Sequence, residues 1–491
     1  MNLYTINHSF HYELENLTRA FFPNEKIGVI QGDSIPDSLE SPYILTVSKE
    51  DTMSVSLSFG DFSETLTAKT GTEDDELTMA TLLYNLLSKL TGISLSWGLL
   101  TGVRPIKLYR RLCEQTGERE AETYFRDKLL VSEEKTQLAK VTCVNEQKIL
   151  NLSQRDSFSL YISIPFCPTR CSYCSFVSQS VEKAKHLIEP YVELLCKEIE
   201  ATGKIARDLN LRLETVYMGG GTPTTLEAHH LSRILAAVKE NFDMSACREF
   251  TVEAGRPDTI TEAKLRALIE GGCDRLSVNP QTLSDEILQN IGRRHTVEDF
   301  YRSFELARKV GFKHINTDLI AGLPGDTPEN FRKTIEGICA LSPESVTVHT
   351  LSMKRSSKLT EENMQIMRED TQAVSQMLHT AYSSLEESGL VPYYLYRQSR
   401  MVGNMENTGW SKPGFEGLYN VYIMDETHTI LACGAGAVTK LKDPDSESIE
   451  RIFNFKYPYE YNARYEELIS RKDAIAPFYM NTLRGGDNKN V

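Results

Sequence analysis

Between about residue 157 and residue 388, short apolar runs alternate with amphipathic stretches. The apolar runs have the length and composition of strands and occur at Ser157–Pro165, Thr215–Met218, Glu249–Ala254, Arg275–Val278, His314–Ala321 and Ser345–Leu351. The amphipathic stretches predict helices at 181–203, 224–241, 261–271, 296–311, 327–341 and near 360–388. Strands that alternate with helices indicate a parallel sheet covered by helices. Six such units are fewer than the eight of a closed barrel, so we expect an α/β fold built on a partial (β/α)6 barrel.

The residues before this region follow a different pattern. Alternating apolar and polar positions predict strands at Leu3–Ile6, Tyr43–Val47, Ser54–Phe59 and Ser63–Ala68, and helical spacing predicts helices at Phe10–Phe21 and Asp75–Leu90. A charged helical connector is expected at 104–152. We therefore predict three parts: an N-terminal α+β domain at 1–152, the barrel at 153–388, and a C-terminal α+β extension at 389–491 with a disordered tail at 486–491.

Composition narrows the class of protein. The chain has 491 residues and a formal net charge of −14, which argues against a nucleic-acid binder with a basic face. It contains no apolar run of the length needed to span a membrane and no signal-peptide pattern at its start. Its ten cysteines comprise one close cluster and seven single residues, which fits reduced thiols better than a disulfide scaffold. We expect a cytoplasmic enzyme.

The cysteine cluster follows the first strand of the predicted barrel. Cys167, Cys171 and Cys174 form a C-x3-C-x2-C array. Cysteine thiolates hold iron–sulfur clusters, and three of them would occupy three corners of a cubane and leave one iron open. An open coordination position distinguishes a catalytic metal site from a structural one. The alternatives are three unrelated buried cysteines, or a zinc site completed by a distant ligand.

Polar residues and glycines end the other strands of the barrel. The second strand ends in Gly219-Gly-Gly-Thr-Pro-Thr224, and glycines allow a ligand to approach the backbone closely. Glu253, Gln281 and Asp318 lie at or near the ends of later strands. A single buried acid is usually structural. Several polar groups at the same end of a parallel sheet instead indicate a binding site at the barrel mouth.

These segments together resemble the radical S-adenosylmethionine (SAM) superfamily. In that superfamily the open iron binds the amino and carboxylate groups of SAM, and one electron from the cluster releases a 5′-deoxyadenosyl radical. The resemblance therefore implies a radical-SAM partial barrel with a [4Fe-4S] cluster held by Cys167, Cys171 and Cys174, and with SAM as the second cofactor.

A closer resemblance involves six motifs. These are Tyr161-x-x-Ile-Pro-Phe-Cys-x3-Cys-x-Tyr-Cys, Gly219-Gly-Gly-Thr-Pro-Thr, Glu253, Arg275-Leu-Ser-x3-Gln281, Arg293 and Asp318-Leu-Ile-x-Gly-Leu-Pro. They are similar to the oxygen-independent coproporphyrinogen III dehydrogenase family over about residues 157–440, and most similar to its HemZ branch. The resemblance implies a SAM site lined by Gly220, Gly221, Thr222, Glu253, Gln281, Arg293 and Asp318. Tyr161 and Tyr173 would lie beside the cofactor, with Tyr161 in a catalytic role, and His349 near it.

The resemblance also implies a tetrapyrrole substrate. The expected reaction converts two propionates of coproporphyrinogen III to vinyl groups, using a one-electron donor of flavodoxin or ferredoxin type; the expected protein is a monomer, and its C-terminal part covers the substrate. Arginine and lysine bind carboxylates, and the candidates for the propionates are Arg256, Arg293, Arg294, Lys354, Arg355, Arg397 and Arg400.

Three positions depart from the patterns of the family. The dehydrogenase pattern has His where this chain has Ser163, and a fourth cysteine where this chain has Phe176. The haem-chaperone branch shares the phenylalanine but carries a histidine where this chain has Tyr419. Two alternatives therefore stay open: a protein that binds or delivers haem, and a radical SAM enzyme that acts on haem itself.

Overall fold

The structure is a computed structural model, and it describes residues 1–23, 25–71, 74–174, 176, 178–352, 371–398 and 401–480. The tail predicted at 486–491 lies outside these residues. The chain divides into two compact units. One comprises Met1–Cys143, Thr360–Ser375 and Leu395–Glu406, and the other comprises Val144–Leu359, Gln376–Tyr394 and Asn407–Val491. The predicted boundaries of three domains stay a prediction.

The larger unit is built on an eleven-stranded sheet with the order β14-β15-β13-β12-β11-β10-β9-β6-β16-β17-β18. Its strands are β6 (Ser157–Ile164), β9 (Arg212–Gly220), β10 (Glu249–Glu253), β11 (Arg275–Ser277), β12 (His314–Ala321), β13 (Ser345–Thr350), β14 (Val391–Tyr396), β15 (Asn407–Ser411), β16 (Thr429–Cys433), β17 (Val438–Lys442) and β18 (Ile449–Phe453). The six predicted strands pair in parallel from β6 to β13. The sheet does not close on itself, so the predicted partial barrel is confirmed.

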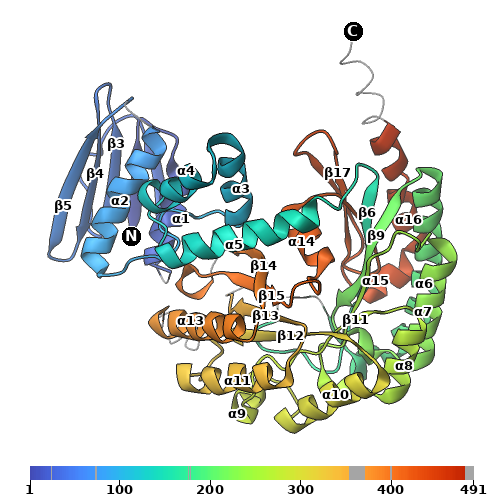
Figure 1. Ribbon diagram of the computed structural model, residues 1–491. Helices are drawn as coiled ribbons and strands as arrows, with labels where there is room; N and C mark the ends of the chain where they lie inside the picture. Colours follow the sequence, from blue (N-terminus) through green and yellow to red (C-terminus); the bar gives the residue numbers. More distant parts are fainter. Residues whose placement is uncertain are drawn as a thin grey trace. The chain divides into compact units, whose positions relative to one another are not determined.

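Helices cover the outer side of these parallel strands (Figure 1). They are α6 (Val181–Asp208), α7 (Ala228–Asn241), α8 (Glu262–Glu270), α9 (Asp285–Asn290), α10 (Val297–Val310) and α11 (Pro328–Leu341); α13 (Thr371–Glu387) follows β13. Four of them begin after a Ser or Thr whose side chain accepts a backbone N–H, namely Thr261, Ser284, Thr296 and Thr327. Such caps satisfy backbone donors that a helix leaves free at its start.

The C-terminal residues extend the same sheet. Strand β16 pairs in parallel with β6, with Thr429 beside Phe158, so the parallel block has one more strand than the alternating pattern predicted. Helices α14 (Leu418–Asp425), α15 (Pro458–Ala463) and α16 (Tyr465–Lys472) accompany it. The buried carboxylate of Glu198 on α6 accepts from Gly434 N at 2.7 Å and from the Lys472 ammonium at 3.0 Å, and so fixes the C-terminal region to the barrel.

The smaller unit contains a five-stranded sheet with the order β2-β1-β3-β4-β5. Its elements are β1 (Asn2–Ile6), α1 (His11–Phe21), β2 (Gly28–Gly32), β3 (Tyr43–Ser48), β4 (Thr52–Phe59), β5 (Phe62–Lys69), α2 (Asp75–Thr91), α3 (Pro105–Thr116) and α4 (Glu118–Thr123); α5 (Glu133–Leu150) follows. Apolar residues of both α1 and α2 pack with those of the sheet in one core. The alternation of apolar and polar residues predicted every strand of this sheet except β2, which is short and partly exposed.

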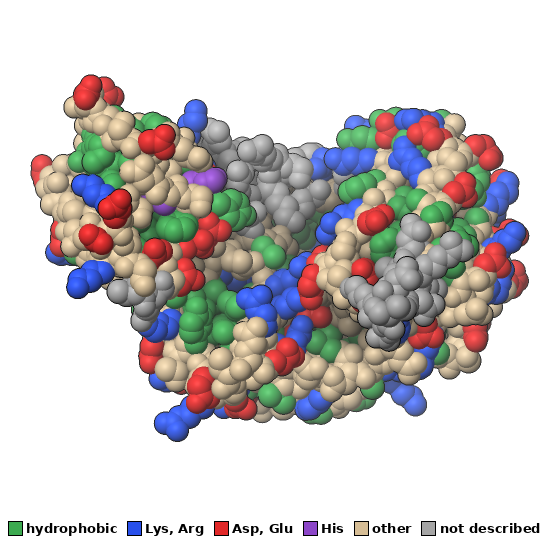
Figure 2. Space-filling view, turned by 90° about the horizontal axis from the view of Figure 1, so that it is seen from above, with side chains coloured by type: hydrophobic (Ala, Val, Ile, Leu, Met, Phe, Trp, Pro, Cys, Tyr) green, Lys and Arg blue, Asp and Glu red, His purple; other side chains and the backbone are tan. Residues whose placement is uncertain are grey.

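Charged side chains of both signs are interspersed on the face shown in Figure 2. Among the described residues, no helix is both long enough and apolar enough to cross a membrane.

Candidate cluster and cofactor site

The three clustered cysteines lie on the loop that continues from β6. Strand β7 (Phe166–Cys167) carries the first of them, and the backbone N–H of Cys174 donates to Cys171 O at 3.3 Å. All three are free thiols. Burial raises the pKa of Cys167 and of Cys174, and the neighbouring Cys171 raises both further. Thiolates gathered in this way need a cationic partner, which an iron–sulfur cluster supplies.

The glycine run packs against this loop. The N–H of Gly221 donates to Ile164 O at 2.8 Å, and the N–H of Thr222 donates to Phe166 O at 2.8 Å. A Cβ added to Gly221 would lie 2.6 Å from Phe166 O and 3.0 Å from Cys167 Sγ. Gly221 is therefore required by the approach of the chain to itself, a reason that the sequence did not reveal.

Polar groups from two neighbouring strands, β11 and β12, meet at the same end of the barrel. The N–H of Gln281 donates to Asp318 O at 3.0 Å, and the Asn316 amide donates to Asp318 Oδ1 at 2.8 Å. The Asn279 side-chain oxygen accepts from Asp318 N at 3.2 Å. The structure thus brings Gln281 and Asp318 together as expected. It also adds Asn279 and Asn316, whose only sequence signal was their position at or beside a strand.

Two carboxylates at this end titrate differently. Burial raises the pKa of Glu253 to about 7, although the Tyr217 hydroxyl donates to it at 2.6 Å. Burial also acts to raise the pKa of Asp318, but His349, at 3.8 Å, and hydrogen bonds from Asn316 outweigh it and hold that pKa below its usual value. Near neutral pH Asp318 is therefore ionised, whereas Glu253 is present in both protonation states.

Buried groups without partners border the cysteine loop. The Arg293 guanidinium donates to Asn279 O at 2.6 Å and to the Tyr173 hydroxyl at 3.2 Å, yet its Nε has no partner in the described part of the chain. The His295 side chain is buried and neither of its ring nitrogens is hydrogen-bonded there. Burial, together with the charges of Arg293 and Arg256, lowers the pKa of His295 to about 3. Such unsatisfied groups are rare in folded proteins and call for a ligand or water.

Three tyrosine rings stack beside Glu253. The ring of Tyr217 lies 4.5 Å from that of Tyr419 and 6.3 Å from that of Tyr161. Burial raises the pKa of Tyr161 and of Tyr173, so both stay protonated at neutral pH. Tyr217 was not singled out from the sequence, because its role depends on a helix far along the chain, α14, which contributes Tyr419.

The two departures from the dehydrogenase pattern have different surroundings. The Ser163 hydroxyl is buried and donates to Ala435 O at 2.8 Å. A Cβ added to Gly220 would lie 3.0 Å from Ser163 Oγ, so this serine packs closely against the glycine run. Phe176, in contrast, is 62% exposed.

The described cations proposed for the propionates already have partners within the chain. Arg256 and Arg397 are buried; the first pairs with Asp258 and the second donates to Leu100 O and Asn404 O. The exposed side chain of Arg294 pairs with Glu182 at 3.2 Å. Three further candidates, Lys354, Arg355 and Arg400, lie outside the described residues.

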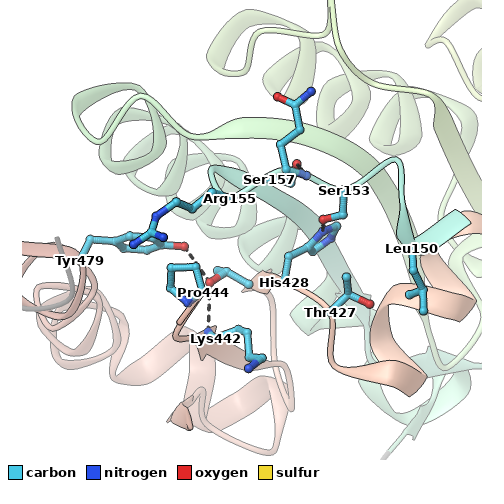
Figure 3. A pocket seen from close by; sticks show the side chains of 11 residues that line it. Leu150, Ser153, Arg155, Ser157, Thr427, His428, Lys442, Pro444 and Tyr479 are labelled. Atoms are coloured by element: carbon cyan, nitrogen blue, oxygen red, sulfur yellow. Dashed lines mark hydrogen bonds between the residues drawn. The ribbon is translucent and has the colours of Figure 1, made fainter. Parts of the chain in front are cut away.

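A separate cavity lies at the opposite end of the strands, where β6 and β16 begin (Figure 3). Its volume is about 310 Å³. Both nitrogens of His428 are bonded at 2.8 Å, to the hydroxyls of Ser153 and Ser159. The hydroxyl of Tyr479 donates to Thr429 at 2.7 Å. The chain itself therefore supplies partners for these polar groups.

Comparison with known proteins identifies the family of this chain. The profile of the radical SAM superfamily matches residues 161–338. The chain is 39% identical over 416 residues to the oxygen-independent coproporphyrinogen-III oxidase-like protein HemZ of Bacillus subtilis, covering 84% of this chain and 83% of that protein. The chain belongs to the HemZ family of radical SAM proteins. The resemblance stated from the sequence is therefore confirmed.

The HemZ-family chain is also similar to one more distant sequence relative and to one solved structure. It is 30% identical over 315 residues to the haem chaperone HemW of Bacillus subtilis, which covers 61% of this chain and 77% of that protein. The solved structure of coproporphyrinogen III oxidase HemN from Escherichia coli matches with a TM-score of 0.50 and 24% identity, over 65% of this chain and 72% of that one. This second likeness shows the fold.

Radical SAM proteins use a [4Fe-4S] cluster and SAM, as expected from the sequence. The site fits both groups. Three free thiols lie on one loop. The Arg293 guanidinium contacts this loop through Tyr173, and its Nε, like both ring nitrogens of His295, has no partner among the described residues.

Proposed function

We propose that this HemZ-family protein converts two propionate side chains of coproporphyrinogen III to vinyl groups. In each conversion one hydrogen atom is transferred from the β-carbon to the 5′-deoxyadenosyl radical, the substrate radical then loses CO2, and one electron passes to an external one-electron acceptor. Two conversions give protoporphyrinogen IX. The observation that carries the proposal is the stack of three tyrosines beside Glu253, at the same end of the barrel as the cysteines. The relatedness to a coproporphyrinogen-III oxidase-like protein over most of the chain supports it.

The proposal assigns a role to each predicted site residue. Cys167, Cys171 and Cys174 hold the cluster. SAM is bound by Gly220, Gly221, Thr222, Glu253, Gln281, Arg293 and Asp318, with Tyr161 and Tyr173 beside it. When bound, the cluster and SAM supply the radical that abstracts a hydrogen atom.

The side chains of the site provide an ionised carboxylate, a carboxyl group that titrates near neutral pH and aromatic rings. Asp318, kept ionised by His349 and Asn316, is suited to accept hydrogen bonds from hydroxyl or ammonium groups. Glu253, whose pKa is about 7, can take up or release a proton near neutral pH. The rings of Tyr161 and Tyr419 pack 6.2 Å apart and form an apolar wall beside Glu253. An external one-electron donor of flavodoxin or ferredoxin type supplies the reducing electron, and the protein acts as a monomer in the cytoplasm.

A second candidate function is haem binding and delivery. Two observations favour it: the likeness to HemW and Phe176, which is exposed at the position of the dehydrogenase's fourth cysteine. In that case the cluster and SAM would remain, but propionates would not be decarboxylated.

One anaerobic assay separates the two candidates. The reconstituted chain is incubated with SAM, a one-electron donor and coproporphyrinogen III, and the products are analysed by mass spectrometry. We expect 5′-deoxyadenosine and a product that has lost two CO2, and neither from the Cys171→Ala variant. Formation of 5′-deoxyadenosine without a vinyl product, together with stoichiometric haem binding, would instead support haem delivery.

A further inference from the structure

Arg256 is fixed beside one of the cluster cysteines. Its side chain is 3% exposed. Two of its nitrogens, Nε and Nη2, donate to the two carboxylate oxygens of Asp258, each at 3.0 Å. This bidentate pair sets the plane of the guanidinium. The remaining nitrogen, Nη1, then points at the cysteine loop, where it lies 3.0 Å from Thr169 Oγ1 and 3.8 Å from Cys171 Sγ.

The cysteine loop has other anchors that do not involve Arg256. The Ser172 N–H donates to Ile291 O at 3.0 Å, and the Thr169 hydroxyl donates to Gly292 O at 3.1 Å. Both acceptors belong to the segment after α9. Because this segment already holds the loop, the position of Cys171 does not depend on the arginine alone, and the contact of Nη1 with the sulfur calls for another explanation.

We propose that Arg256 is a positioning residue that raises the reduction potential of the cluster through its hydrogen bond to Cys171. Reduction adds one negative charge to the cluster and its thiolates. A cationic N–H donor beside a ligand sulfur stabilises that charge, and hydrogen bonds to the sulfurs are among the factors that set cluster potentials. The carboxylate of Asp258 orients the donor but partly offsets its charge. The inference rests on the cluster and is independent of the substrate assigned under the proposed function.

The test is a potentiometric titration of the reconstituted protein, followed by electron paramagnetic resonance, without SAM and without substrate. In Arg256→Gln, we expect the ratio of reduced to oxidised cluster at a fixed potential to fall about tenfold, a shift of ~59 mV for one electron. Asp258→Asn removes the offsetting charge, so its potential should shift in the opposite direction. The matched control is Arg266→Gln, which removes an exposed arginine paired with Glu262 on α8 and should leave the potential unchanged.

A cluster with full iron content and an unchanged potential in Arg256→Gln would overturn the proposal. If that variant fails to retain iron, Asp258→Asn decides: an upward shift supports the role of charge, and an unchanged potential refutes it. Because no substrate is present, an inactive protein in the decarboxylation assay has no bearing on this result.

Discussion

The two ends of the parallel strands contain histidines with the same charge state but different surroundings. Burial lowers the pKa of both His295, at the cysteine end, and His428, at the opposite end, to about 3. His428 has a hydroxyl partner on each ring nitrogen, whereas His295 has none among the described residues. The end with the cavity of about 310 Å³ is thus the satisfied one. Because buried groups without partners call for a ligand or water, we expect ligands to bind at the cysteine end rather than in this cavity.

The largest effect that tests this comparison is loss of the cluster. Cys171→Ala should abolish binding of the four irons expected of a cubane, because two thiolates would remain. The control is Cys196→Ala, which lies on α6, outside the loop. Iron and sulfide analysis after anaerobic reconstitution measures both. Full iron content in Cys171→Ala would refute the ligand assignment.

The close approach of the glycine run to the cysteine loop gives the next effect. Gly221→Ala would place a Cβ 2.6 Å from Phe166 O, and such overpacking costs about 3 kcal/mol of unfolding free energy. Gly102→Ala is the control, since a Cβ there meets no atom within 4 Å. Denaturant titration of the two apo variants compares them. Equal stabilities would show that the loop can move away from β9.

The two histidines can be compared directly by replacing each of them with leucine. His428→Leu leaves the hydroxyls of Ser153 and Ser159 without this partner, so we expect a loss of about 2 kcal/mol of unfolding free energy. His295→Leu removes two nitrogens that have no partners in the described structure, and the apo protein should lose no stability. Chemical denaturation without cofactors measures both. A larger loss for His295→Leu would contradict the contrast between the two ends.

The last effect depends on pH and is due to Glu253. Its pKa of about 7 in the folded chain lies above the value of about 4.3 for an unfolded glutamate. The folded state therefore holds the proton more tightly, and this contribution to stability is present below about pH 4.3 and is lost as the pH rises through 7. Relative to the wild type, Glu253→Gln should gain about 3–4 kcal/mol of unfolding free energy between pH 4 and pH 8, because each pKa unit of difference corresponds to about 1.4 kcal/mol. An unchanged difference across this range would place the carboxyl in solvent.

Much of the barrel was predictable because its signals are local. The alternation of apolar runs located strands from β6 to β13 within a few residues, and His314–Ala321 was predicted with its observed bounds. The parallel direction of these strands correctly implied that Gln281 and Asp318 would meet. The parallel pairing of β16 with β6 was not predicted, because it joins segments far apart in the chain, and periodicity carries no information about such pairing.

Within the site, the sequence revealed residue types but not their partners. Arg256 was predicted to bind a propionate, yet it pairs with Asp258 and contacts Cys171. Tyr217 and His295 were not assigned roles, since these depend on neighbours from other elements. The individual roles of the SAM-site residues stay predictions.

The place of β16 beside β6 also constrains the order in which the protein folds. Strand β6 leads directly to the cysteine loop, but its neighbour on one side ends at Cys433. During synthesis, the edge of β6 therefore stays unpaired until most of the chain has left the ribosome. An unpaired strand edge is prone to pair with other chains, and the loop that it supports carries three reactive thiols. Cluster insertion is thus expected to follow completion of the barrel, and chains truncated before β16 should aggregate rather than acquire iron.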